Sequence, residues 1–143
     1  MLLLGSNGFV GSKLKKVLNK KFKIYSPSTK DLNLRKKANL EKYFSKYKLD
    51  IVVNCAWKIN SKSDNSLVRN NNKKNNILIS KNLYEVVSKS SIDYFINLSS
   101  INIYNESKNK VFEKKIYEKN YLSNNPESSA KKILIKKFKN KNK

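Results

Sequence analysis

The sequence has no histidine, a single cysteine, two prolines and three glycines in 143 residues. The lone Cys55 excludes an intramolecular disulfide and is typical of proteins from a reducing compartment. No apolar run approaches the length of a membrane span, and Met1–Leu4 is too short for the apolar region of a signal peptide. These absences predict a cytoplasmic protein without a membrane partner.

Acidic residues are also scarce, with 10 Asp and Glu against 32 Lys and Arg, for a net charge of +22. Specific nucleic-acid readers tend to use arginines in localised patches, but Arg35 and Arg69 are the chain's only arginines. The lysines are spread along the whole chain among many asparagines, which is typical of AT-rich genomes. We therefore expect no specific nucleic-acid partner and keep nonspecific binding through the lysines as an alternative function.

Short apolar runs alternate with amphipathic stretches, and this spacing predicts a parallel α/β sheet with helices on both faces. The run at residues 50–56 is continuous, as expected for a strand covered on both faces. Residues 57–76 and 105–127 are expected to be polar or charged loops. The expected strands are residues 1–4, 22–25, 50–56 and 94–98; the expected helices are residues 10–20, a stretch through 40–47, 76–87 and 128–139.

All three glycines lie in the loop Gly5–Gly11, between the first expected strand and the first expected helix. Strand, glycine turn and helix N-terminus are together the arrangement that binds a nucleotide pyrophosphate, although three spaced glycines can also form an ordinary βα turn. Ligands of such sheets bind beyond the carboxyl ends of the strands. The loop, Ala56-Trp57 and Ser99-Ser100 are therefore expected at one edge.

Five segments in order resemble the motifs of the extended short-chain dehydrogenases/reductases, the NAD-dependent epimerase/dehydratase family. Its GDP-fucose synthases and related sugar-nucleotide reductases look most similar. The resemblance covers residues 1–138 and implies an incomplete Rossmann-type, doubly wound NAD(P)-binding domain, followed by a basic tail at residues 139–143. The matching segments are Gly5-Ser6-Asn7-Gly8-Phe9-Val10-Gly11, Asp31-Leu32, Asn54-Cys55-Ala56-Trp57, Asn76 and Leu98–Tyr104.

The resemblance implies a role for each matching residue. Gly5, Ser6, Asn7, Gly8, Phe9, Val10 and Gly11 would hold the pyrophosphate of NADP or NAD. Asp31 and Leu32 would flank the adenine, although Asp31 could instead cap a helix before Asn33. Ala56, Trp57 and Asn76 would belong to the cofactor site, Ser100 would be catalytic, and no metal is expected. The stretch Tyr25–Lys30 has hydroxyls and a cation but no acid, which slightly favours NADP.

Two departures from the family pattern argue against catalysis. The family uses a tyrosine with a lysine four residues later, which lowers the pKa of the tyrosine and holds the nicotinamide ribose. Here Lys131 stands at the lysine position, which implies a catalytic and cofactor-binding role, but Glu127 stands at the tyrosine position. A glutamate would be ionised at neutral pH and could not act as the proton donor. The sequence also contains no C-terminal substrate domain, so we expect weak or no turnover of a nucleotide sugar.

Three explanations for the missing domain are open: a truncated or frameshifted gene product, which we favour, a fragment, or a reduced protein. The alternative to an enzyme is a noncatalytic interaction module. In that case the resemblance implies that residues 76–87 and 128–138 would form the helical seam of a homodimer.

Overall fold

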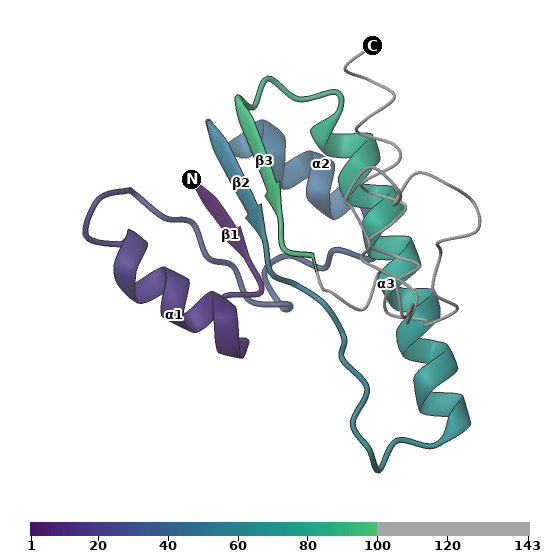
Figure 1. The fold of residues 1–143 in the computed structure, drawn as a ribbon. Coiled ribbons are helices and arrows are strands. Elements are labelled where there is room, and N and C mark those ends of the chain that lie inside the picture. The colour runs from purple at the N-terminus through teal and green to yellow at the C-terminus, as the bar shows by residue number, and fades with distance from the viewer. Residues whose placement is uncertain (100–143) are drawn as a thin grey trace, which may run out of the picture. The chain divides into compact units, whose positions relative to one another are not determined.

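The computed structural model of the protein describes residues 1–99 (Figure 1). Their core is a parallel sheet of order β1-β2-β3. The chain forms two compact units: the first contains residues 1–57 and 85–98, and the second contains residues 58–84. The strands are β1 (Leu2–Leu4), β2 (Ile51–Asn54) and β3 (Tyr94–Asn97), and the helices are α1 (Phe9–Leu18), α2 (Lys37–Lys46) and α3 (Ser66–Val87).

The order of the strands creates a switch point at β1. β2 pairs with one edge of β1, with Leu4 opposite Asn54. On the other edge, Tyr25 forms an isolated parallel bridge with Leu2. The chain after β1 therefore goes first to one side of that strand and then to the other. α1 and α2 lie on opposite sides of the strands (Figure 1), which gives the layered α/β architecture expected from the sequence.

The expected strand at residues 22–25 is wrong as a continuous strand, because only Tyr25 joins the sheet. Its N–H donates to the Met1 carbonyl and its carbonyl accepts from the Leu3 N–H, each at 2.9 Å. The next N–H of a parallel ladder would come from residue 27, which is proline and has none. At the other end, the Phe22 N–H donates back to the Leu18 carbonyl, so Phe22 closes α1 instead.

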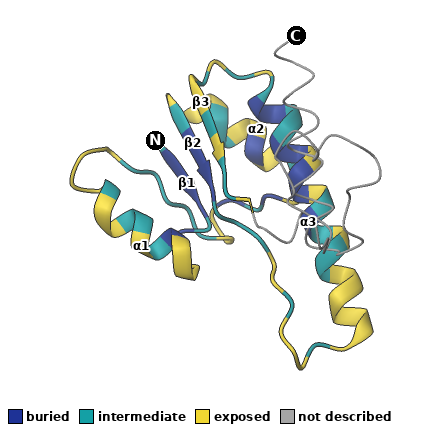
Figure 2. Ribbon diagram, in the orientation of Figure 1, coloured by how far each residue is buried: buried dark blue, intermediate teal, exposed yellow. Residues whose placement is uncertain are grey.

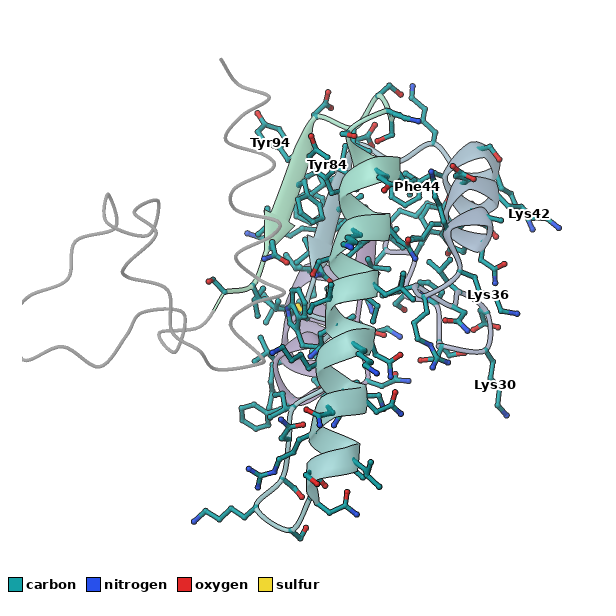
Figure 3. All side chains as sticks on the ribbon, turned by 90° about the vertical axis from the view of Figure 1, so that its right-hand side faces the viewer. Lys30, Lys36, Lys42, Phe44, Tyr84 and Tyr94 are labelled. Atoms are coloured by element: carbon teal, nitrogen blue, oxygen red, sulfur yellow. The ribbon has the colours of Figure 1, made fainter. Side chains whose placement is uncertain are left out.

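The core of the first unit consists of aliphatic side chains from the strands and from the segments that cover them (Figure 2). All of β1 and the last three residues of β2 are buried, as expected for strands covered on both faces. β3 differs, since Tyr94 and Ile96 are 66% and 51% exposed while the alternate residues are half-buried. Tyr94 projects from β3 on the side away from α2 (Figure 3).

The helices of the described residues agree with the predicted periodicity except at the start of α3. α1 and α2 occupy the expected stretches, whereas α3 begins at Ser66 instead of Asn76. Asn65 caps this earlier start, because its Oδ1 accepts from the Val68 N–H at 2.9 Å. Leu67 is 77% exposed, so these first turns bury no apolar stripe and had no helical period in the sequence.

The expected loop at residues 105–127 and the expected helix at residues 128–139 lie outside the described residues. Within residues 1–99, the structure contains no helix both long and apolar enough to span a membrane.

Candidate functional site

The loop from Gly5 to Gly11 joins β1 to α1 and depends on two of its glycines. Gly5 has φ +75°, a conformation that side chains disfavour, and a Cβ there would lie 2.7 Å from the Ala56 nitrogen and the Cys55 carbonyl. A Cβ on Gly11 would collide with the Gly5 carbonyl oxygen. Gly8 is under less constraint, since its Cβ would lie 3.3 Å from that same oxygen. Gly5 and Gly11 thus let three backbone segments meet.

The loop ends in a helix N-terminus without a side-chain cap. Gly8 is the N-cap residue in an extended conformation, and the first turn of α1 contains no acidic residue. Backbone bonds close the turn, because the Gly8 N–H donates to the Gly5 carbonyl at 3.0 Å and the Ser12 N–H to the Gly8 carbonyl at 2.9 Å. The other N–H groups of the first turn lack helical partners and lie at the positive end of the helix dipole. This geometry suits an anion.

The surroundings of the loop are mixed in exposure. Ser6 is buried, whereas Asn7, Gly8 and Val10 are exposed and Phe9 is 83% exposed. Because the loop follows β1 at the switch point, it lies where ligands of open α/β sheets bind. A phosphate group approaching α1 would therefore meet residues that are exposed to solvent, among them Gly8, which has no side chain.

Asp31 closes a tight turn with Ser28 on the exposed surface. Its Oδ2 accepts from the Ser28 N–H at 3.0 Å and from the Ser28 hydroxyl at 2.7 Å. These hydrogen bonds hold the pKa of the Asp31 carboxyl below its usual value. α2 does not begin until Lys37, so the alternative in which Asp31 caps a helix before Asn33 is wrong. The adjacent Leu32 is buried and anchors the turn to the core.

The carboxyl end of β2 is held by an asparagine that the sequence analysis gave no role. Asn54 is fully buried; its Oδ1 accepts from the Ala56 N–H at 3.1 Å and its Nδ2 donates to Asn97 Oδ1 at 2.8 Å. The Cys55 N–H donates to the Leu4 carbonyl at 2.9 Å. Burial raises the pKa of the Cys55 thiol, so it is a poor nucleophile at neutral pH. The sequence signal that could have indicated this bond was an asparagine at the last position of both β2 and β3.

In the second unit, Asn76 clamps the chain directly after Trp57. The Asn76 side chain is buried; its Oδ1 accepts from the Lys58 N–H at 3.0 Å and its Nδ2 donates to the Lys58 carbonyl at 2.8 Å. Both ends of the amide therefore bind backbone, as a neighbouring strand would. In this arrangement Asn76 fixes the course of the chain at Lys58, and Trp57 itself is half-buried.

The first unit brings together the glycine loop and Ala56, two of the expected site segments. The expected catalytic residues Ser100 and Lys131, and Glu127 at the tyrosine position, lie outside the described residues. Lysines surround α2 on the outer surface of the first unit, where Lys30, Lys36 and Lys42 point away from the sheet (Figure 3).

The sequence model of the NAD dependent epimerase/dehydratase family matches residues 1–137. No curated protein matches the chain significantly. Among solved structures, a GDP-L-fucose synthetase from Naegleria fowleri has a TM-score of 0.78 and 21% identity, over 99% of this chain and 44% of that one. The fold of the chain is therefore found in a protein of more than twice its length.

Two further structures show the same likeness. A GDP-mannoheptose C4 reductase from Campylobacter jejuni with NADP bound has a TM-score of 0.77 and 18% identity, over 94% of this chain and 43% of that one. A dTDP-4-dehydrorhamnose reductase from Clostridium acetobutylicum has a TM-score of 0.74 and 20% identity, over 97% of this chain and 48% of that one. The chain spans less than half the length of each of these proteins.

Proposed function

The chain belongs to the NAD dependent epimerase/dehydratase family, and on that premise we propose that it binds a nicotinamide dinucleotide whose pyrophosphate lies on the glycine loop. The observation that carries the proposal is the geometry of Gly5 and Gly11, which leaves no room for a Cβ at either position. The tight turn therefore leads directly into the N-terminus of α1, which has no side-chain cap and no acidic residue in its first turn. These are the properties that a pyrophosphate site requires.

Each part of the site has a separate task in this proposal. The N–H groups of Phe9, Val10 and Gly11 donate to phosphate oxygens, because these groups have no acceptor within the helix. Ser6 is buried at the start of the loop, and Ala56 borders the nicotinamide ribose. When bound, the dinucleotide supplies or accepts a hydride, and the residues of this chain only hold and orient it.

The adenosine end lies at the Ser28–Asp31 turn in this proposal. The Asp31 carboxylate is bound to Ser28, and Lys30 is exposed and points outward (Figure 3). A cation beside hydroxyl groups suits a 2′-phosphate better than a free 2′-hydroxyl, so we propose a modest preference for NADP over NAD. The GDP-mannoheptose C4 reductase, which has NADP bound, supports the same choice by analogy.

Isothermal titration calorimetry of the full 143-residue chain with NADPH and with NADH tests this proposal. We expect saturable binding of both, with NADPH the tighter ligand. Folded protein that releases no heat with either dinucleotide would contradict the binding proposal. Tighter binding of NADH would contradict the preference alone. Lys30→Gln is the matched variant, because it should weaken NADPH binding and leave NADH binding unchanged.

For the whole reaction, we propose that the family chemistry is hydride transfer to or from a nucleotide sugar and that residues 1–143 alone have weak or no activity. Two observations support this: the motif order of the sequence assigns Glu127 to the proton-donor position, and the chain spans less than half of each of the related structures above. Incubating the chain with NADPH and GDP- or dTDP-linked 4-keto sugars tests it. Oxidation of NADPH at ordinary enzyme rates, on the order of 10 per second, would contradict it.

A further inference from the structure

The buried Asn54 and the half-buried Asn97 form an oriented hydrogen-bond chain across the ends of β2 and β3. Asn54 and Asn97 are register partners in the parallel sheet, so their side chains lie on the same face. The Ala56 N–H donates to Asn54 Oδ1 at 3.1 Å, and Asn54 Nδ2 donates to Asn97 Oδ1 at 2.8 Å. Nothing in the proposed binding of the dinucleotide uses either asparagine directly.

The direction of this chain follows from chemistry alone. A backbone N–H can only donate, so the atom of Asn54 facing Ala56 must be its oxygen. The nitrogen of Asn54 therefore faces Asn97, and the oxygen of Asn97 must receive it. Asn97 Nδ2 is then left as a buried donor with no acceptor among residues 1–99. An arrangement that leaves a buried donor unpaired has a cost, which calls for a compensating role.

The chain acts on the peptide that forms the floor of the glycine loop. Gly5 approaches the Cys55–Ala56 peptide so closely that a Cβ would lie 2.7 Å from the Ala56 nitrogen. Two hydrogen bonds orient this peptide segment: Cys55 N–H to the Leu4 carbonyl and Ala56 N–H to Asn54 Oδ1. Because Gly5 lies this close, a change in the orientation of the peptide would change the surface that Gly5 meets. The Asn54 amide thus controls the surface on which the loop rests.

We propose that Asn54 and Asn97 are positioning residues for the dinucleotide site, which hold the Cys55–Ala56 peptide in the orientation that Gly5 requires. This inference rests on the proposed function, because the glycine loop matters only if it holds a dinucleotide. Asn54 contacts the peptide through its oxygen, and Asn97 fixes the Asn54 amide by binding its nitrogen. Neither residue is proposed to touch the dinucleotide.

Two substitutions at the same position separate positioning from simple burial. In Asn54→Asp, one carboxylate oxygen still accepts from Ala56, and Asn97 can turn its amide over so that Nδ2 donates to the other oxygen. Asn54→Leu has a similar size but keeps neither bond. Asn97→Ser is the second breaking variant, since it removes the partner of Asn54 Nδ2 and leaves the bond to Ala56. Asn71→Leu, at an exposed position of α3, is the matched control for the change of side-chain type.

The experiment measures NADPH affinity by calorimetry and the exchange rate of the Ala56 amide by NMR, well below the melting temperature of each folded variant. Loss of the Asn54 bond to the Ala56 N–H predicts about a tenfold loss of affinity and about a tenfold faster Ala56 exchange in Asn54→Leu. Asn54→Asp and Asn71→Leu should stay within about threefold of wild type in both, and Asn97→Ser should fall between, as expected for partial loss of orientation. A role in stability alone would lower the melting temperature and speed exchange at many core amides together, without lowering the NADPH affinity of the folded protein.

Several outcomes would overturn the inference. Folded Asn54→Leu with wild-type affinity would do so, and so would Asn54→Asp losing as much affinity as Asn54→Leu. If Asn54→Leu does not fold, Asn97→Ser decides: wild-type affinity in that variant contradicts the role of Asn97. If the wild-type chain binds neither dinucleotide, the proposed function fails. The exchange rate of Ala56 then still decides whether Asn54 and Asn97 orient the peptide.

Discussion

A negative charge placed at the start of α1 should strengthen the helix and weaken dinucleotide binding. Phe9 is the first residue of α1 and is 83% exposed, so Phe9→Asp removes little packing. An acid in the first turn interacts favourably with the helix dipole and should raise the free energy of unfolding by about 0.3–1 kcal/mol. The same charge repels a pyrophosphate bound at that N-terminus. Opposite effects on stability and affinity are the expected signature.

The size of the repulsion follows from the exposure of Phe9. Two unit charges about 4 Å apart in a water-like environment interact with about 1 kcal/mol. A pyrophosphate in a dinucleotide carries two such charges, so Phe9→Asp should cost about 2 kcal/mol of binding free energy, or roughly a thirtyfold loss of affinity. The loss should shrink at high salt, because the charges are exposed and screened.

The assay is calorimetric titration of NADPH with Phe9→Asp and with Phe9→Asn, which is equal in size but uncharged. Val17→Asp is a second control, because Val17 is 63% exposed in the last turns of the same helix. We expect only Phe9→Asp to show the thirtyfold loss. The reasoning is refuted if Phe9→Asp and Phe9→Asn bind equally well, or if Val17→Asp loses as much affinity as Phe9→Asp.

Three further predictions concern stability. Gly11→Ala should lower the free energy of unfolding by about 1–3 kcal/mol in urea titrations, because its Cβ collides with the Gly5 carbonyl, whereas Gly8→Ala should stay within about 0.5 kcal/mol; equal effects would contradict the geometry. Asn76→Leu should cost about 1–3 kcal/mol through the lost clamp on Lys58, and Asn71→Ala should cost less than about 0.5 kcal/mol. The Asp31 pKa is lowered by Ser28, so its contribution to stability is present above pH roughly 4 and is lost as pH falls through the folded pKa. The stability difference between wild type and Asp31→Asn should therefore be constant from neutral pH down to about pH 5 and disappear in acid; a difference that persists in acid would contradict this role.

The strongest local patterns in the sequence predicted the corresponding structure. The change from an apolar run to glycine spacing and then to a helical period placed β1, the loop and α1, because each is decided by neighbours in the sequence. Residues 22–25 were predicted to be a strand because their side chains favour β structure. Only Tyr25 bridges the sheet, since the ladder needs an N–H at residue 27 and Pro27 has none. The early start of α3 was missed because exposed turns capped by Asn65 need no apolar stripe.

Contacts between distant segments were harder to predict. The Asn54–Asn97 bond joins residues 43 positions apart, and each asparagine alone is typical of a strand end. The clamp between Asn76 and Lys58 also depends on a backbone course that periodicity does not encode. By contrast, the glycine at position 5 indicated that another backbone segment comes close, because glycine is needed where backbones meet. The sequence did not indicate that this segment is the one at Ala56.

The most direct test of the central claim is an NMR titration of the isotope-labelled wild-type chain with NADPH, followed at the backbone amides. The pyrophosphate proposal predicts the largest shift changes at Gly8, Phe9, Val10 and Gly11, with smaller changes at Ala56 and saturation at a single affinity. Shift changes confined to lysine-rich surfaces far from the loop, or none at these four amides in folded protein, would contradict it.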